Sequence, residues 1–355
     1  MLKTELKNRC LPALRSREEM KEIMQREVYG YLPAVDFSIS VSEPETVEKR
    51  LMCGQVHHSF VNLTISVGEK THSFRVDRVL HTDEQKRPLI LLNNFHHFES
   101  QYFPKEEMSE YDVDWLVFCY NDICSDDGDF TNGLAPLLLP DGQSAPTDCG
   151  KIGIWAWAAM RVLDYGLTLP GTDAGNVAIA GHSRLGKTAL YTAMTDERFK
   201  YALSNAAGCA GDSLAHGSTG VLWDEDAPER GENIADIVMR FPFWFCKNYA
   251  KYTEKSISDE FDQHFLLASV APRYVCVGSC DLDFWADIHS QQMCCMAASE
   301  QWEKAGLEGL VNSQKYLEAG QSLLDGHVGY FMIHSKHFLS RHSWKNFMSF
   351  VEKHK

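Results

Sequence analysis

The segment from residue 176 to residue 194, NVAIAGHSRLGKTALYTAM, most constrains the fold of this chain. An apolar run over residues 176–180 predicts a buried strand, and the residues after Gly186 favour a helix. Ser183 lies at the junction, three residues after the apolar run ends at Ala180 and two residues after Gly181. Small residues there let a strand and a helix approach closely, and the helix N-terminus offers N–H groups to a developing oxyanion. The arrangement is typical of a nucleophile elbow.

The spacing around this serine is G-x-S-x-x-G rather than G-x-S-x-G, so the local pattern leaves two interpretations open. In the first, Ser183 is a nucleophile. In the second, its hydroxyl caps the N-terminus of the following helix. The order of the remaining groups distinguishes them, because an α/β-hydrolase presents serine, then Asp or Glu, then histidine along the chain.

Short apolar runs that alternate with loops or helices predict a parallel sheet. Residues 150–166 carry apolar positions at helical spacing and predict one of the connecting helices. We therefore expect an α/β fold of the α/β-hydrolase type, with a mostly parallel central sheet flanked by helices. The predicted strands are PLILLNN (88–94), DWLVFCYN (114–121), NVAIAGHS (176–183), YALSNAAG (201–208), RYVCVGS (273–279) and QKYLEAG (314–320).

The chain is expected to fold as one domain, residues 1–355, because no repeat, low-complexity tract or Gly/Ser linker divides it. Residues 1–80 predict an N-terminal extension, with a charged helix over 14–30 and a hairpin over 56–80. A long aromatic and charged segment, residues 212–262, interrupts the alternation of strands and helices. We expect this segment to form a cap-like insertion over the active site.

Acidic and histidine side chains follow the last two predicted strands, where this fold supplies its acid and base. Any of the aspartates after the strand at 273–279 is eligible as the acid. The last strand is predicted at residues 315–319, and a histidine in the loop after it can take the serine proton and return it to the leaving group. The order of serine, aspartate and histidine along the chain therefore matches that of an α/β-hydrolase. Which aspartate is the acid and which histidine is the base stays open. The candidates are Asp281, Asp283 and Asp287, and His327, His334, His337 and His342.

Composition argues against several classes of partner. The chain has 34 Lys and Arg against 49 Asp and Glu, a formal charge of -15, which argues against nucleic acid. No apolar run reaches membrane-spanning length and no signal-peptide core is visible, so we expect a cytoplasmic protein without membrane contact. Eleven scattered cysteines fit reduced thiols. The pairs His57-His58 and His96-His97 lack metal-binding spacing, and phosphate- and nicotinamide-binding motifs are missing, so we expect neither metal nor cofactor.

The motif GHSRLGK resembles the G-x-S-R-x-G-K signature of glucuronoyl esterases, carbohydrate esterase family 15, and of related bacterial acetylxylan-esterase-like α/β-hydrolases. The resemblance accounts for the unusual spacing after the serine and extends from about residue 90 to about residue 350. It continues through WAW (155–157), LDY (163–165), DERF (196–199), RGENIADI (230–237), FPFWF (241–245), DQHFLLA (262–268), APR (271–273), DFWAD (283–287) and KHFLSRHSW (336–344).

The resemblance implies roles for single residues of the catalytic apparatus. Ser183 is expected to be the nucleophile, Arg184 to help hold the oxyanion, and His337 to be the base. Asp283 is favoured as the triad acid because it occupies the first position of D-x-W, and Asp281 is the runner-up.

For the substrate, the resemblance implies contacts from Lys187, Glu232 and Trp285 to a uronic-acid moiety. An ammonium and a carboxylate suit the hydroxyls of a sugar, and an indole offers an apolar face to its ring. Two features depart from the family: His182 stands where glucuronoyl esterases commonly have cysteine, and residues 212–229 are particular to this chain. With a cytoplasmic location, a small soluble carbohydrate ester is expected as the partner rather than a polymer.

The sequence thus predicts a serine-dependent carboxylic ester hydrolase that acts on a glucuronoyl or 4-O-methyl-glucuronoyl ester. An acetylxylan esterase or general carboxylesterase is the alternative within the same chemistry. A non-catalytic carbohydrate-binding relative is the alternative of another class. The presence of all three triad residue types argues against this last one.

Overall fold

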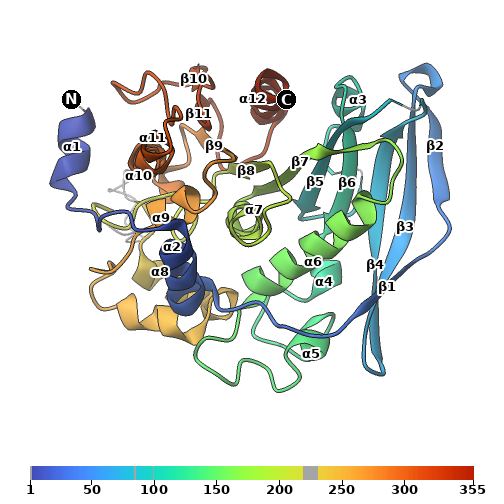
Figure 1. The fold of residues 1–355 in the computed structure, drawn as a ribbon, viewed down its shortest axis with the longest axis horizontal. Helices are drawn as coiled ribbons and strands as arrows, with labels where there is room; N and C mark the ends of the chain where they lie inside the picture. The colour runs from blue at the N-terminus through green and yellow to red at the C-terminus, as the bar shows by residue number, and fades with distance from the viewer. Residues whose placement is uncertain (1, 84, 99, 219–230) are drawn as a thin grey trace.

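The computed structural model describes residues 2–83, 85–98, 100–218 and 231–355 (Figure 1). Its strands are β1 Ser38–Val41, β2 Glu45–Leu51, β3 Val56–Val67, β4 Lys70–His81, β5 Arg87–Asn94, β6 Asp114–Cys119, β7 Thr172–His182, β8 Tyr201–Asn205, β9 Tyr274–Cys280, β10 Ser322–Leu323 and β11 Val328–Ile333. Its α-helices are α1 Leu2–Asn8, α2 Arg17–Met24, α3 Lys105–Met108, α4 Tyr120–Ile123, α5 Ala135–Leu138, α6 Lys151–Gly166, α7 Arg184–Thr195, α8 Ile234–Arg240, α9 His264–Ala268, α10 Ile288–Ala298, α11 Glu300–Lys304 and α12 Arg341–His354.

The described strands form one mixed sheet of eleven members, in the order β1-β3-β4-β6-β5-β7-β8-β9-β11-β10, with β2 paired to β3. Its centre, β6-β5-β7-β8-β9-β11, is parallel throughout. The strands β1 to β4 and β10 pair antiparallel at its two sides. Because the carboxyl ends of parallel strands share one edge, the loops that follow β5, β6, β7, β8, β9 and β11 gather there.

Alternate residues of the central strands pack into two separate cores, as the two-residue period of a strand requires. In β7, Val177 and Ile179 join one core, while Ala178 and Ala180 join the other. Helices α6, α7, α9 and α10 contribute to the first core, and α12 contributes to the second. The sheet is therefore covered on both faces by helices (Figure 1), which explains why its strands read as continuous apolar runs.

The predicted α/β fold with a mostly parallel sheet is confirmed, including the hairpin β3–β4 and helix α6. The strand predicted at residues 315–319 is wrong, because the last parallel strand is β11. The KYLEA segment mixes charged and apolar residues, and the Leu317 N–H donates to the Gln292 side chain at 2.9 Å instead of to a strand. In contrast, all six residues of β11, VGYFMI, are buried. His327 consequently precedes the last strand, whereas His334, His337 and His342 follow it.

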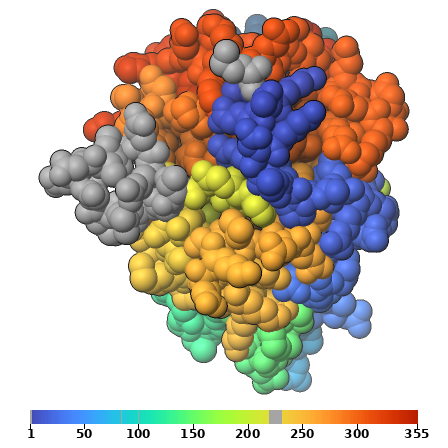
Figure 2. Space-filling view, turned by 90° about the vertical axis from the view of Figure 1, so that its left-hand side faces the viewer, coloured from blue at the N-terminus to red at the C-terminus, as the bar shows by residue number. Residues whose placement is uncertain are grey.

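The N-terminal residues pack against elements far along the chain. Figure 2 shows them in blue beside the gold and orange segments. The Arg9 guanidinium donates to the His216 carbonyl at 3.1 Å and to Ser290 Oγ at 2.7 Å. The predicted N-terminal helix begins at Arg17 rather than residue 14, because Ser16 caps it and forms a capping box. These contacts tie the start of the chain to the loops that surround the sheet edge.

Part of the expected cap-like insertion, residues 219–230, lies outside the described residues. Its described part contains α8, which begins at a capping box on Asn233, and two 3-10 segments, Pro242–Trp244 and Lys247–Tyr252. Among the helices that the structure describes, none is both long and apolar enough to cross a membrane.

Candidate active site

Ser183 occupies a sharp turn between β7 and α7, with φ 58° and ψ −126°. A left-handed φ is costly for a residue with a side chain and is concentrated at functional sites. Gly181 permits the turn, because a Cβ there would lie 2.0 Å from the Leu185 carbonyl oxygen. Gly186 also sits close, since its added Cβ would lie 2.9 Å from Ser204 Oγ. The two glycines explain the G-x-S-x-x-G spacing physically.

The Ser183 side chain makes no capping hydrogen bond to α7 within the described part of the chain. The interpretation of this serine as a helix cap therefore has no support in the structure. Its side chain instead lies at the wall of a cavity of about 380 Å³, which His337 and Asp283 also line. The loops after β7, β9 and β11 bring these three residues together at the carboxyl edge of the sheet.

His337 and Asp283 form a tight pair, with 2.5 Å between His337 Nδ1 and Asp283 Oδ2. The Asp283 side chain is 3% exposed, while that of His337 is 40% exposed. A buried carboxylate on Nδ1 holds the imidazole in the tautomer that leaves Nε2 free to accept a proton.

The other candidate residues in the two loops lie elsewhere. Asp281 Oδ2 lies 2.7 Å from His334 Nδ1, and the side chain of this histidine is 75% exposed. Asp287 accepts a hydrogen bond from Ser290 N at 3.1 Å and caps α10. His342 lies in the first turn of α12.

Arg184 also lines this cavity, and its guanidinium is held by several contacts. Its Nη1 donates to Asp126, whose other oxygen accepts the Trp244 indole N–H at 2.6 Å. The guanidinium carbon lies 4.6 Å from the centroid of the Trp244 ring. Arg184 Nε finds no hydrogen-bond partner among the described residues. The sequence interpretation missed Asp126, since nothing in its loop, SDDGDF, links it to an arginine 58 positions later.

Lys187 and Glu232 are both buried in the cavity wall. The Lys187 ammonium donates to the Ala207 carbonyl, and burial lowers its pKa, which the nearby Glu232 charge opposes. Burial raises the pKa of Glu232 to about 7. Its Oε1 has no hydrogen-bond partner within the described residues. A buried polar atom left without a partner is costly, so this oxygen is available to a ligand hydroxyl.

An aromatic wall closes the cavity on the side of the expected cap. Trp285 lies half-buried, and the guanidinium carbon of Arg240 is 4.1 Å from its ring centroid. Phe241 and Trp244 stack at 3.9 Å with an angle of 3° between their rings. The Glu232 N–H donates to the Trp285 carbonyl at 3.0 Å, which joins the cap segment to the Asp283 loop. The motif FPFWF contains Phe241 and Trp244, but no role was predicted for either residue, and Arg240 lies outside the predicted motifs.

His182 packs beside His337, with 4.5 Å between the two ring centroids. The Nδ1 of His182 lies 2.9 Å from Asn205 Nδ2 and 3.1 Å from the Asn205 carbonyl oxygen, and the same amide nitrogen donates to the Phe338 carbonyl at 3.2 Å. Burial lowers the pKa of His182 well below its usual value, and the neighbouring His337 is the second-largest cause. A neutral ring therefore packs against the proposed base and fixes one side of its loop.

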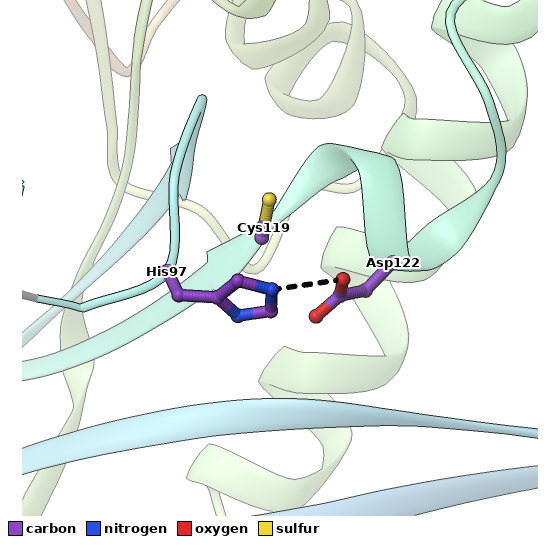
Figure 3. Close-up of side chains that lie close together, drawn as sticks. All are labelled: His97, Cys119 and Asp122. Atoms are coloured by element: carbon purple, nitrogen blue, oxygen red, sulfur yellow. Dashed lines mark ion pairs between the residues drawn. The ribbon is translucent and has the colours of Figure 1, made fainter.

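The histidine pairs of the sequence have different surroundings. His58 pairs with Asp77 in the sheet, with 2.8 Å between Nε2 and Oδ1. His96 stacks on Tyr102 with ring centroids 6.0 Å apart. Its neighbour His97 turns instead toward Cys119 and Asp122 (Figure 3).

Comparisons with known proteins identify relatives over most of the chain. The family profile described as glucuronyl esterase, fungi, matches residues 63–306. A carbohydrate esterase, MZ0003, from an unknown prokaryotic organism is 32% identical over 237 residues, 65% of this chain and 52% of the relative. The 4-O-methyl-glucuronoyl methylesterase of Podospora anserina is 25% identical over 296 residues, 82% of this chain and 56% of the relative. The chain thus spans about half the length of these curated relatives.

Solved structures share the fold over nearly the whole chain. The glucuronoyl esterase from Solibacter usitatus aligns with a TM-score of 0.83 and 26% identity, over 96% of this chain and 92% of that one. The catalytic domain of the glucuronoyl esterase from Hypocrea jecorina aligns with a TM-score of 0.69 and 20% identity, over 95% and 82%.

Proposed function

Because this chain belongs to the glucuronoyl esterase family, carbohydrate esterase family 15, we propose that it hydrolyses small soluble esters of glucuronic or 4-O-methyl-glucuronic acid. One observation carries the proposal. The cavity beside the strained Ser183 is lined both by the His337–Asp283 pair and by buried polar groups suited to a sugar, Lys187 and Glu232.

In the proposed reaction, His337 Nε2 removes the Ser183 hydroxyl proton as Oγ attacks the ester carbonyl carbon. The resulting oxyanion is stabilised by the Arg184 guanidinium and by backbone N–H groups in the first turn of α7. Asp283 stabilises the imidazolium that forms. The intermediate collapses when His337 gives its proton to the leaving alcohol, which leaves an acyl-enzyme on Ser183.

Water then completes the reaction. His337 removes a proton from a water molecule, the hydroxide attacks the acyl carbon, and the second tetrahedral intermediate is held by the same donors. Collapse returns the proton to Ser183 Oγ and releases the free uronic acid. Each step uses side chains that line the cavity, and the proton count closes on Ser183 and His337.

The acyl side of the ester is proposed to occupy the space between Lys187, Glu232 and Trp285. The Lys187 ammonium donates to hydroxyl oxygens of the sugar. Glu232 Oε1, which has no hydrogen-bond partner among the described residues, accepts from a hydroxyl or, when protonated, donates to one. The half-buried Trp285 face packs against the C–H face of the ring. Burial of Lys187 and Glu232 makes these bonds selective, because a substrate without hydroxyls leaves Glu232 Oε1 unsatisfied and gives Lys187 no acceptor on the substrate.

Hydrolysis of benzyl glucuronate beside 4-nitrophenyl acetate tests this proposal, with wild type, Ser183→Ala, Lys187→Ala and Trp285→Ala. Ser183→Ala should abolish cleavage of both esters. Lys187→Ala and Trp285→Ala should depress glucuronate cleavage far more than acetate cleavage. Lys304→Ala, a surface lysine of α11, is the matched control and should leave both rates unchanged. Equal losses on the two esters would reject the sugar site and leave a general carboxylesterase.

A further inference from the structure

A second cluster of chemically active side chains lies at the carboxyl ends of the neighbouring parallel strands β5 and β6. Cys119 is the last residue of β6, Asp122 follows one turn later in α4, and His97 lies in the loop after β5. Each residue offers one ligand atom: a thiol sulfur, a carboxylate oxygen or an imidazole nitrogen. These three atoms lie within 4.8 Å of one another (Figure 3). His97 Nε2 and Asp122 Oδ1 are 3.3 Å apart.

We propose that His97, Cys119 and Asp122 form a binding site for a zinc-type divalent cation. Zinc binds histidine nitrogen and carboxylate oxygen at about 2.0–2.2 Å and thiolate sulfur at about 2.3 Å. Tetrahedral bonds of these lengths place the ligand atoms roughly 3.3–3.7 Å from one another. The 3.3 Å between His97 Nε2 and Asp122 Oδ1 already matches, and the other two separations are at most 4.8 Å, which side-chain rotation on binding would shorten. The soft thiolate favours zinc over magnesium or calcium.

The surroundings of the three residues fit a ligand set better than a simple ion pair. The Cys119 side chain is buried, and its thiol lies 3.6 Å from the Phe95 carbonyl oxygen. An exposed histidine–carboxylate pair does not require a thiol beside it and is worth little by itself. His72 Nε2 lies 2.6 Å from the Asp122 carbonyl oxygen and holds the turn that carries this carboxylate. Such a contact orients a metal ligand from behind.

His96 offers a contrast within the same loop. Its ring stacks on Tyr102 and is not part of the cluster, while the ring of His97 pairs with Asp122. The His97 side chain is 60% exposed, so a cation can reach the cluster from solvent and a water molecule can fill the fourth position.

The cluster is separate from the Ser183 cavity, because its three members are not among the described residues that line the cavity. It adjoins the catalytic region through Phe95, whose ring packs edge-on against Tyr120 at 5.3 Å and lies 5.5 Å from the Arg184 guanidinium carbon. The cation is therefore inferred to fix the loop after β5 rather than to take part in ester hydrolysis. Binding replaces the thiol proton, which passes to the buffer, by a sulfur–metal bond.

Titration of the untagged full chain with Co²⁺ and Zn²⁺ tests the inference. Co²⁺ should bind in equimolar amount with a thiolate-to-cobalt charge-transfer band, and Zn²⁺ should displace it, whereas Mg²⁺ should not. Cys119→Ala should lose the band. His97→Ala, an exposed position that leaves the core intact, should lower Zn²⁺ affinity by at least the roughly 10- to 100-fold that loss of an outer partner costs.

His96→Ala and Cys53→Ala are the matched controls and should bind Co²⁺ and Zn²⁺ like the wild type. Absence of the charge-transfer band in the wild type would overturn the inference. Equal Zn²⁺ affinity in His97→Ala and His96→Ala would also overturn it. Ser183→Ala should bind both metals normally, so these outcomes are independent of the proposed esterase activity.

Discussion

Two histidine–aspartate pairs bridge the same two loops, and only one of them belongs to the cavity. His337 pairs with Asp283 across 54 positions, and His334 pairs with Asp281 across 53. In the first pair the carboxylate is 3% exposed, whereas in the second it is 25% exposed and also accepts the Ser335 N–H at 3.0 Å. The same chemical pair thus occurs in two settings: one lies at the cavity wall with Ser183, where we propose that it orients the base, and the other links two surface loops.

The largest expected effect separates the two histidines. His337→Ala should reduce kcat for benzyl glucuronate on the order of 10⁶-fold, the scale of losing the base of a serine hydrolase. His334→Ala should change kcat by less than about threefold, because a solvent-exposed pair contributes little. Steady-state kinetics on both variants measure this difference, and comparable losses would break the comparison.

Substitution of Asp283 should likewise lower kcat more than substitution of Asp281, although the difference should be smaller than that between the two histidines. Asp283→Asn should lower kcat about 10⁴-fold, because an amide at this position favours the wrong imidazole tautomer. Asp281→Asn should leave kcat nearly unchanged and cost only a little thermal stability. If Asp281→Asn proved the more damaging change, the runner-up would be the acid and the assignment would reverse.

Substitution of Arg184 tests the oxyanion site separately from the two histidine–aspartate pairs, because the proposed role of Arg184 is to hold the oxyanion. Arg184→Ala should reduce kcat about 10²- to 10³-fold. Asp126→Asn should cost less, since the guanidinium keeps its packing on Trp244. Arg198→Ala, a surface arginine paired with Asp164 and Asp196, is the control. Near-normal turnover in Arg184→Ala would exclude its assigned role.

The smallest expected effect is a pH dependence of stability that arises at Glu232. Burial raises the pKa of this carboxyl from 4.5 to about 7, and the charge of Asp283 contributes to the rise. The folded state therefore holds a proton that the unfolded state has lost, and the free energy of unfolding should fall as pH increases from about 4.5 to 7.

Denaturant unfolding of wild type and Glu232→Gln across this pH range measures the effect. The glutamine variant should lose this part of the fall, because an amide does not ionise. Asp283→Asn should shift the fall to lower pH, whereas Asp281→Asn should leave it in place. Parallel pH profiles for wild type and Glu232→Gln would contradict the raised pKa.

The sequence predicts the parallel strands and the elbow because buried strands and tight turns leave local patterns. The sequence misplaces the last strand at KYLEA, residues 315–319. The strand is VGYFMI, residues 328–333, and the burial of all six of its residues is a property of the packed structure. The sequence cannot pair each histidine with its aspartate by spacing, because 53 and 54 positions are nearly equal. The sequence also does not predict the contact of Asp126 with Arg184, because this contact depends on how two distant segments meet at the sheet edge.

Covalent labelling by a fluorophosphonate, with the modified residue located by peptide mass spectrometry, tests directly whether Ser183 is the nucleophile and His337 its base. We expect an adduct on Ser183 that forms at similar rates in wild type and His334→Ala, and that is nearly lost in His337→Ala and absent in Ser183→Ala. Equal labelling rates in His334→Ala and His337→Ala, or an adduct on another residue, would contradict this assignment.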